Sequence, residues 1–225
     1  MLDFLNSVPA EIGLENAILK RFAGKIALVS AFGTESAIVL HMVASIDRSL
    51  PVIFLDTLKM FPETLAYRDD LTARLGLTNV HSLRPDASQL AAYDPDEKLW
   101  QNDPDTCCAI RKSNPLDAAL NGMQAWITGR KRSQGGARAN LQFLEPGPDN
   151  RVTVNPLALW DDAQIATYFE THNLPRHPLQ AQGYASVGCM NCTLRTGETA
   201  DKRAGRWAGL NKTECGIHLP RLAIA

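Results

Sequence analysis

The sequence predicts an α/β domain in which a mainly parallel sheet is flanked by helices. The first observation is alternation: a short apolar segment at residues 25–30 is followed by a segment of helical periodicity at 35–46, and the pattern continues along the chain. The second is that the short segments are apolar at successive positions, as in strands buried on both faces. A chain of 225 residues suits one core of this kind, so we expect a single domain over 1–225.

The remaining elements follow in order. A second strand is expected at 51–56, and the next helix starts at Pro62, which suits a first helical turn, and stops at Gly76. Weaker periodicity marks the later elements. We expect strands at 78–83, 124–128 and 151–155, and helices at 86–93, 115–121 and 161–172.

Four stretches look irregular. Residues 94–106 are polar, and residues 173–225 form a loop-rich extension with few periodic runs. The segments 131–140 and 145–150 are rich in glycine or proline, and we expect both to be mobile. Parallel sheets bind ligands at the carboxyl ends of their strands, so a site is expected in the loops that follow them.

The charge balance removes a general electrostatic case for polyanionic partners. Lysine and arginine number 23 and aspartate and glutamate 24, a formal net charge of −1, so neither nucleic acid nor an anionic membrane is expected. No apolar run approaches the ~20 residues that span a bilayer. Residues 1–20 carry acidic groups and lack the compact apolar stretch of a signal peptide, so we expect a cytoplasmic protein.

Five cysteines form two pairs and one single residue. Cys107 and Cys108 are adjacent, Cys189 and Cys192 form a C-x-x-C, and Cys215 stands alone. An odd number without a secretion signal argues against disulfides, and thiolate sets of this kind bind zinc or an iron–sulfur cluster. Adjacent cysteines can hardly supply two corners of one tetrahedron, but they can bind two different iron atoms, which favours the cluster.

Three other segments can carry chemistry. Residues 30–36, which leave the first strand, can hold an anion on backbone N–H groups, with a plain capped turn as the alternative. Their single glycine matches neither a Walker A nor a Rossmann loop. Cations gather at 129–134 and 202–207, where arginine forks suit phosphate or sulfate oxygens and solvated surface charge is the alternative.

Two single residues add to this set. Lys112 comes four residues after Cys108, and its ammonium returns to the cysteine face if the segment is helical. Cys215 has Lys212 and His218 as near neighbours, and basic groups lower the pKa of a thiol and favour its reactive form. A surface lysine and an incidental free cysteine are the alternatives.

Taken together, these motifs resemble those of the assimilatory adenylyl-sulfate (APS) reductases of bacteria, a branch of the phosphoadenylyl-sulfate reductase family. One departure is Leu58, where many relatives have glycine after the Asp-Thr pair. The motifs keep the family order over about residues 25–218. They are Ser30-Ala-Phe-Gly-Thr-Glu-Ser36, Asp56-Thr57, Phe61-Pro-Glu-Thr64, Cys107-Cys-x-x-Arg111-Lys112, Pro115-Leu116, Thr128-Gly-Arg130, Arg132-Ser-Gln134, Asn155-Pro156-Leu157, His177-Pro-Leu179, Gly188-Cys-x-x-Cys-Thr193, Arg203-Ala-Gly-Arg-Trp207 and Glu214-Cys-Gly-Ile-His218.

The resemblance implies a fold, a cofactor and a reaction. The fold would be an adenine-nucleotide alpha-hydrolase-like (PP-loop) domain, with residues 208–225 as a mobile tail that carries the nucleophile Cys215. One four-iron four-sulfur cluster would be bound by Cys107, Cys108, Cys189 and Cys192. The enzyme would reduce adenosine 5′-phosphosulfate to sulfite and AMP through an S-sulfocysteine, resolved by reduced thioredoxin or a glutaredoxin-like donor. A homo-oligomer is expected by the same analogy.

The resemblance also assigns substrate-binding residues. Phosphosulfate contacts would come from Lys112, Arg203, Arg206 and His218, with Arg130 and Arg132 as further candidates. The nucleotide loop would be lined by Ser30, Phe32, Gly33 and Glu35, and the adenosine would be bordered by Asp56 and Thr57.

Three alternatives remain at this stage. The 3′-phosphorylated substrate would need another cation, which the segment 131–138 could supply, although relatives specialised for it usually lack the cluster cysteines. A PP-loop enzyme that transfers sulfur with ATP should show a more glycine-rich loop and a basic RNA-binding surface. A non-catalytic metal-stabilised module predicts that replacing Cys215 by serine leaves function intact.

Overall fold

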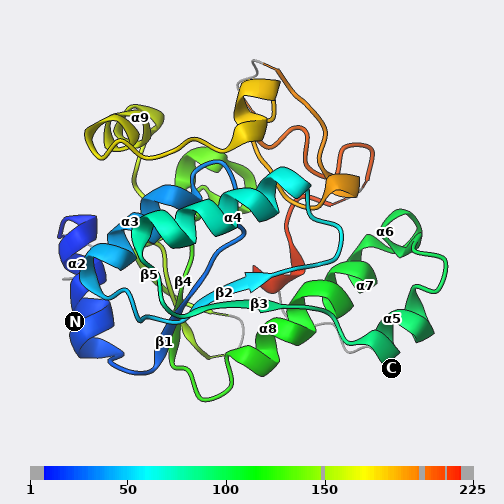
Figure 1. Ribbon diagram of the computed structural model, residues 1–225, viewed down its shortest axis with the longest axis horizontal. Helices are drawn as coiled ribbons and strands as arrows, with labels where there is room; N and C mark the ends of the chain where they lie inside the picture. Colours follow the sequence, from blue (N-terminus) through cyan, green and yellow to red (C-terminus); the bar gives the residue numbers. More distant parts are fainter. Residues whose placement is uncertain (1–7, 148–149, 198–200, 211, 219–225) are drawn as a thin grey trace.

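The computed structural model describes residues 8–147, 150–197, 201–210 and 212–218, and these contain one six-stranded sheet (Figure 1). The strands lie in the order β3-β2-β1-β4-β6-β5, and every neighbouring pair is parallel except β5 with β6. This confirms the α/β fold with a mainly parallel sheet. The strands are β1 (Ile26–Val29), β2 (Val52–Leu55), β3 (Val80–Leu83), β4 (Ala125–Ile127), β5 (Leu144–Pro146) and β6 (Val152–Val154).

Helices connect successive strands. Among the described residues, one α-helix precedes β1, one follows each of β1, β2 and β6, and four short α-helices lie between β3 and β4. In chain order they are α2 (Ala10–Asn16), α3 (Ser36–Ile46), α4 (Pro62–Leu75), α5 (Ala87–Tyr93), α6 (Leu99–Asn102), α7 (Pro104–Cys108), α8 (Asn114–Ala119) and α9 (Asp162–Thr171). None of the helices in the described ranges is long and apolar enough to cross a membrane.

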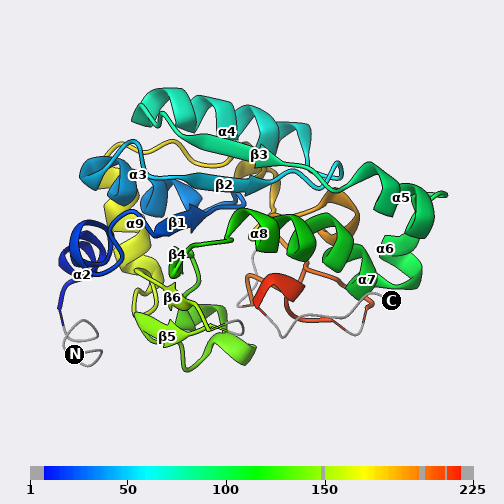
Figure 2. The same cartoon turned by 90° about the horizontal axis from the view of Figure 1, so that it is seen from below.

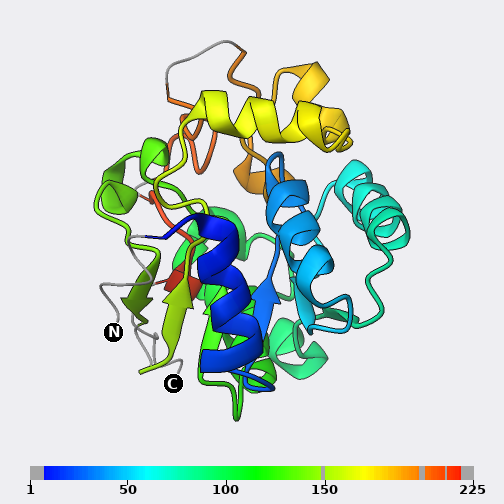
Figure 3. The same ribbon diagram turned by 90° about the vertical axis from the view of Figure 1, so that its left-hand side faces the viewer.

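The side chains of each central strand divide between two cores, one on each face of the sheet. Along β1, Ile26 and Leu28 join the larger core, to which α2, α3, α4 and α9 contribute. Ala27 and Val29 point to the other face and join a smaller core with Leu116 of α8. In Figure 1, α3 and α4 accordingly lie above β2 and β3, and α8 lies below them. Figure 2 shows β3 and β5 at opposite ends of the sheet. Helix α3 is central to its layer, since it contacts α2, α4 and α9 (Figure 3).

Local sequence sets the helix ends as expected. Helix α4 has Pro62 in its first turn and ends at Gly76, whose φ of 63° is the left-handed conformation that glycine adopts at little cost. Helix α9 starts at Asp161, which accepts a hydrogen bond from the backbone of Gln164, while the Gln164 side chain bonds back to the cap.

The topology creates a position for a site. The chain runs from β1 outward to β3, then crosses to β4 on the other side of β1. The connections on the two sides of this point cover opposite faces of the sheet, because α3 and α4 join the larger core and α8 the smaller one. The carboxyl ends of β1 and β4 therefore border a topological switch point, where open α/β sheets bind ligands.

Two expectations about irregular segments are corrected. Residues 94–106 contain α6 and the start of α7, because buried Asp94 accepts a hydrogen bond from the backbone of Leu99 and pairs with Arg111, which fixes this polar segment. The segment 145–150 begins inside β5, which pairs antiparallel with β6 at the edge of the sheet. An edge strand tolerates Pro146, so proline there was a poor guide to irregular structure.

The C-terminal region is loop-rich, as predicted. After α9 it contains only short 3-10 turns within the described part: η5 (Pro178–Gln182), η6 (Met190–Cys192) and η7 (Gly216–His218). Two antiparallel bridges hold it, Met60 with Cys189 and Thr193 with Arg206. In the segment 131–140, η3 (Arg132–Gln134) and η4 (Gly136–Arg138) form. Of the expected tail 208–225, residues 211 and 219–225 lie outside the described residues.

Candidate active site

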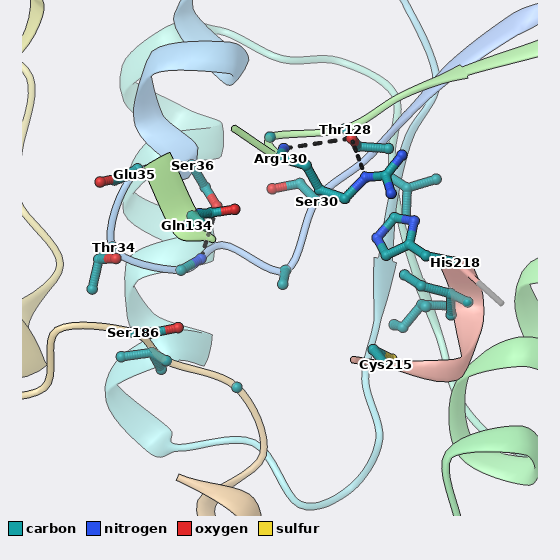
Figure 4. A pocket seen from close by; sticks show the side chains of 18 of the residues that line it. Ser30, Thr34, Glu35, Ser36, Thr128, Arg130, Gln134, Ser186, Cys215 and His218 are labelled. Atoms are coloured by element: carbon teal, nitrogen blue, oxygen red, sulfur yellow. Dashed lines mark hydrogen bonds between the residues drawn. The ribbon is translucent and has the colours of Figure 1, made fainter. Parts of the chain in front are cut away.

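A pocket lies at the carboxyl ends of β1 and β4, at the switch point (Figure 4). Figure 4 shows the loop after β1 on one side and the segment with Cys215 and His218 facing it across the pocket. The predicted site residues that line this pocket are Ser30, Gly33, Glu35, Lys112, Arg130, Arg203, Arg206, Cys215 and His218. They come from five separate parts of the chain, which the fold brings together.

The loop after β1 has a strained but well-bonded backbone. The Ser30 Oγ accepts a hydrogen bond from the Phe32 N–H at 3.2 Å, and the Ser36 Oγ accepts one from the Gly33 N–H at 2.8 Å. Phe32 has a φ of 47°, and its fully buried ring packs edge-on against Phe54 with centroids 5.5 Å apart. Because this ring is part of the core, the loop keeps its shape without a ligand.

Glu35 is tied to the loop after β4. Its Oε1 lies 2.8 Å from the Lys131 Nζ, which lies 2.8 Å from the Asp162 Oδ1 as well. Lys131 is almost fully buried. The two loops that border the pocket and the first turn of α9 are therefore joined by one lysine.

The segment 212–218 is docked in the pocket. The thiol of half-buried Cys215 is hydrogen-bonded to that of Cys108. This bond and the attraction of Lys112 and Arg206 lower the pKa of Cys215 well below the usual thiol value, against the opposing effect of burial. The His218 ring stacks on Trp126 of β4 at 5.1 Å between centroids, with an angle of 18°.

The cations around Cys215 crowd one another. Burial lowers the pKa of Arg203 to about 10, and the neighbouring Arg138 acts in the same direction. Burial likewise lowers the pKa of Arg206, whose guanidinium lies against Gly188 so closely that a Cβ there would be 2.2 Å from its Nη2. The pocket is thus a desolvated, positively charged chamber, which suits an anionic ligand.

A second, smaller pocket adjoins the first, and its walls carry the other four cysteines. Cys107 and Cys108 reach it from α7, and Cys189 and Cys192 from the segment around η6. The Thr57 hydroxyl lies 3.2 Å from the Cys189 sulfur, and the backbone bridge between Met60 and Cys189 holds the two segments together. The other residues lining this pocket are Lys59, Trp100, Pro104, Arg111, Lys112, Asn191 and Trp207.

The donor set suits a cluster better than one ion. In the described ranges, no three His, Cys, Asp or Glu side chains are grouped to hold a single metal ion. The four thiols line the wall of a shared cavity instead, and the charged side chains around it are cationic. Thiolates spread around a cavity and neutralised by cations fit an anionic iron–sulfur cluster, whose iron atoms are separate points of attachment.

Lys112 lines both pockets. It sits in a π-helical turn, η2 (Ala109–Ser113), which links α7 to α8 and adds a residue to the local helical repeat. Burial alone would lower the pKa of Lys112, but the thiols of Cys189, Cys215 and Cys108 raise it above its usual value. The ammonium therefore stays charged between the cysteines and the main pocket.

Four predicted substrate residues take other positions. The Phe32 side chain faces the core, and Arg132 donates to the Leu141 carbonyl at 2.6 Å. Asp56 is buried and accepts hydrogen bonds from the Leu58 backbone and from Arg84. Thr57 belongs to the cysteine pocket's surroundings, where its carbonyl accepts from Arg111. None of the four is among the residues that line the main pocket in the described part of the chain.

Two residues that line the pocket, Trp126 and Arg138, and Glu214, which pairs with Arg138, were given no role of their own from the sequence. Trp126 stacks on His218, but as a buried strand residue it looked like core. Arg138 lies in the glycine-rich segment and was considered only as one cation of a loop. Glu214 pairs with Arg138, and its place directly before Cys215 was the one available signal.

Comparisons with known proteins agree with this geometry. A family model described as "Phosphoadenosine phosphosulfate reductase domain" matches residues 25–195. A protein of Chelativorans sp. (strain BNC1) named "Adenosine 5'-phosphosulfate reductase" is 49% identical over 95% of this chain and 87% of its own length. A protein of Mesorhizobium japonicum with the same name is 48% identical over 96% of this chain and 85% of its own length. The crystal structure of phosphoadenylyl-sulfate (PAPS) reductase from Candida auris, a phosphate complex, superimposes with a TM-score of 0.72 at 26% identity, covering 86% of this chain and 96% of that one.

Proposed function

The chain belongs to the phosphoadenosine phosphosulfate reductase domain family, and on this premise we propose that it reduces adenosine 5′-phosphosulfate to sulfite and AMP in assimilatory sulfate reduction. One observation carries the proposal. Cys215 lies in the same pocket as the loop after β1 and as a group of buried cations, and a separate pocket holds the other four cysteines.

The substrate would lie with its nucleotide end at the β1 loop and its sulfate toward the cations. Ser30, Gly33 and Glu35 border the first region. Lys112, Arg203 and Arg206 line the same pocket as Cys215 and interact electrostatically with its thiol. Figure 4 shows His218 beside Cys215, and Arg130 between these residues and the β1 loop. Arginine forks match the oxygens of phosphate and sulfate, and burial strengthens those contacts.

The first chemical step is a sulfonate transfer to Cys215. Its thiolate attacks the sulfate sulfur, a bond forms between the two sulfur atoms, and the bridging sulfur–oxygen bond breaks. AMP leaves with that oxygen and its electron pair on the phosphate. Three sulfate oxygens repel a thiolate, so Lys112, Arg203 and Arg206 lower the barrier by offsetting the charge of the transition state.

The second step needs two electrons from a dithiol. A thiolate of reduced thioredoxin, or of a glutaredoxin-like donor, attacks the inner sulfur of the S-sulfocysteine, and sulfite leaves. The second donor thiol then releases Cys215 and forms the donor's disulfide. For this step the segment around Cys215 has to leave the pocket. A cytoplasmic location suits this donor, because thiols stay reduced there.

We propose a four-iron four-sulfur cluster on Cys107, Cys108, Cys189 and Cys192. When bound, it would supply structural cross-linking of α7 to the η6 segment and a fixed negative charge beside Lys112. Lys112 lines both pockets, so this chain's own ammonium would stand between that charge and the substrate anion. Iron and acid-labile sulfide analysis of protein purified without oxygen should give about four of each per chain, and Cys107→Ser should lower both.

The preferred substrate carries a free 3′-hydroxyl. A 3′-phosphate would need a cation from the segment 131–138, and two of the three cations there, Lys131 and Arg138, are already in ion pairs, while the Arg132 Nε donates to the Leu141 carbonyl. Lys131 is buried between Glu35 and Asp162, and Arg138 pairs with Glu214. We therefore favour adenosine 5′-phosphosulfate over its 3′-phosphorylated analogue.

The test is sulfite release from cluster-containing protein with reduced thioredoxin, with both substrates offered in parallel and Cys215→Ser beside the wild type. Sulfite from adenosine 5′-phosphosulfate that disappears in the variant supports reaction and nucleophile. Turnover of the 3′-phosphorylated analogue alone would keep the chemistry and change the substrate. Sulfite from neither, in protein shown to carry its cluster, would reject the proposal and favour ATP-dependent sulfur transfer.

A further inference from the structure

Glu214, the residue directly before Cys215, forms a bidentate ion pair with Arg138. The Oε1 of Glu214 accepts a hydrogen bond from the Arg138 Nε at 2.5 Å, and its Oε2 accepts one from the Arg138 Nη2 at 2.7 Å. Fork-to-fork pairing of this kind fixes direction as well as distance. The guanidinium is held in turn by the Gln134 side chain, to which its Nη1 donates.

Both partners are buried. Glu214 and Arg138 are each 8% exposed. Burial alone would raise the pKa of Glu214, but Arg138 outweighs it and holds the pKa below the usual value. A buried charge that loses its bidentate partner carries a desolvation cost, so the docked position of Glu214 depends on Arg138.

A second arginine supports the same position. The Arg203 Nη2 donates to the Thr213 carbonyl at 2.9 Å and lies 3.5 Å from the Glu214 Oε2. Arg138 belongs to η4, which follows β4. Arg203 lies three residues before Arg206, whose backbone bridges to Thr193, the residue after Cys192. Arg138 and Arg203, which come from different segments, therefore both hold Glu214, the residue directly before Cys215.

Other contacts hold the tail as well, among them the hydrogen bond between the Cys215 and Cys108 thiols. Gly216 packs beside Ser113, since a Cβ on Gly216 would lie in ordinary contact, 3.4 Å from the Ser113 Oγ. His218 stacks on Trp126, and Lys212 pairs with the exposed Asp105 on α7. A thiol hydrogen bond, an ion pair through one lysine nitrogen and one stacked ring hold the backbone before Cys215 less firmly than a buried bidentate ion pair does.

We propose that Arg138 and Glu214 form a clamp that positions Cys215, and that opening this clamp is what exposes the thiol to its reductant. Both are positioning residues, since they act through the backbone of the neighbouring nucleophile. The consequence for turnover rests on the proposed function of Cys215, whereas the docking itself does not.

The test measures how fast Cys215 is alkylated. Full-length protein, purified without oxygen, is treated with iodoacetamide, a neutral reagent, and the Cys215 peptide is followed by mass spectrometry. Rates are compared on the high-pH plateau, where thiolate formation no longer limits them. We expect Glu214→Gln to raise the plateau rate by about ten- to a hundredfold, because losing a charged hydrogen bond enlarges the undocked fraction by this order.

A matched control separates tethering from charge. Glu145 pairs with Arg130 at 2.5 Å, beside the same cations but on β5, away from the tail. Glu145→Gln removes an equal charge and should leave the alkylation rate of Cys215 at the wild-type value. In a double-mutant cycle, Arg138→Gln with Glu214→Gln should react no faster than either single variant, since each opens the same clamp.

Four outcomes overturn the clamp: an unchanged rate in Glu214→Gln, an equal acceleration in Glu145→Gln, additive effects of the two clamp variants, or a wild-type rate equal to that of an unstructured cysteine peptide. The wild-type sulfite assay reports separately on the proposed function. If the protein releases no sulfite but shows the expected alkylation pattern, the proposed reaction is rejected and the clamp is supported. If it releases sulfite but lacks this alkylation pattern, the clamp is rejected and the reaction is supported.

Discussion

Leu58 occupies a backbone conformation that disfavours its own side chain. Its φ is 60°, in the left-handed region, where an L-residue with a Cβ meets the following carbonyl oxygen. The Leu58 N–H donates to the Asp56 Oδ1 at 3.1 Å, which holds this turn at the end of β2. The Leu58 side chain is 48% exposed, so its hydrophobic burial offsets little of the free-energy cost of this backbone conformation. The turn therefore favours glycine at this position.

Leu58→Gly should therefore be neutral or stabilising. Relief of the strain offsets the greater flexibility of glycine in the unfolded chain. The matched control is Leu159→Gly, because Leu159 is 57% exposed and its φ is not positive. Urea unfolding should place the control lower in stability by about 1 to 2 kcal/mol. An equal loss in both variants would contradict the strain.

Lys112 should matter more for turnover than for folding. Lys112→Ala removes the one cation of the described residues that lines both pockets, and we expect kcat to fall by about a hundredfold, the effect of losing a preorganised charge at a reacting group. Lys59→Ala, which removes a cation lining only the cysteine pocket, should lose far less. Thermal unfolding and iron content report whether the variants remain folded and loaded. Unchanged turnover in Lys112→Ala would count against the link between the pockets.

The helical run from α7 to α8 shows what one extra residue in a helical repeat achieves. Its π-helical turn, η2, lies between Cys108 and α8, and the turn contains Lys112 and Arg111. Arg111 reaches the Thr57 carbonyl after β2 and pairs with Asp94, while Lys112 faces the pockets. Of these two adjacent cations, Arg111 thus holds the structure together and Lys112 lies at the site.

His177 joins α4 to the C-terminal region. Its Nε2 lies 3.1 Å from the Thr64 Oγ1, its Nδ1 accepts from the Leu179 N–H, and its ring packs against Tyr67. Burial lowers its pKa from 6.5 to about 4. Accepting a backbone N–H requires an unprotonated Nδ1, so the contacts need the neutral ring.

Stability should fall with acid through this residue. The folded-state pKa is depressed, so the unfolded chain binds more protons between about pH 6.5 and pH 4, and the contribution present at neutral pH is lost as the pH falls. From pH 7 to pH 5 this amounts to about 2 kcal/mol. His177→Gln should lack this part of the pH dependence in urea unfolding. Identical pH profiles for variant and wild type would exclude the role.

Lys131 links three parts of the molecule that are distant in sequence. Its ammonium joins Glu35 at the start of α3 to Asp162 at the start of α9, and Lys131 itself follows β4. The network continues to the C-terminal region, because the Lys202 Nζ lies 2.7 Å from the same Asp162 oxygen. The pocket's two loops are therefore held by the overall packing of the domain.

Removing the buried lysine of this ion-pair network, Lys131, should lower the free energy of unfolding far more than removing the exposed lysine, Lys202. Lys131→Met should lower the free energy of unfolding by about 2 kcal/mol, because Glu35 loses its partner in a largely buried setting. Lys202→Met, whose side chain is 40% exposed, should change it by less than about 0.5 kcal/mol. Urea unfolding of both variants measures the difference, and equal effects would refute the distinction.

Much of the architecture followed from local patterns. Apolar runs at residues 25–30 and 51–56 predicted the buried strands β1 and β2, and Pro62 and Gly76 predicted the ends of α4, because backbone preferences act over a few residues. The five cysteines and their spacing separated a nucleophile candidate from a ligand set, and the structure places the two groups in adjoining pockets. Strand β5 and helix α6 escaped prediction because pairing with β6 and the buried Asp94 stabilise them.

The sequence by itself determined the α/β class, the order of its main elements and the residue types that carry the chemistry. Only the tertiary structure decided which of those residues share a pocket. In the tertiary structure, the Phe32 ring is buried in the core, Arg132 donates a hydrogen bond to the Leu141 carbonyl, and Glu214 forms an ion pair with Arg138. The physical reason is that strand and helix preferences are local, whereas the partner of a buried charge is chosen by packing between segments far apart in the chain.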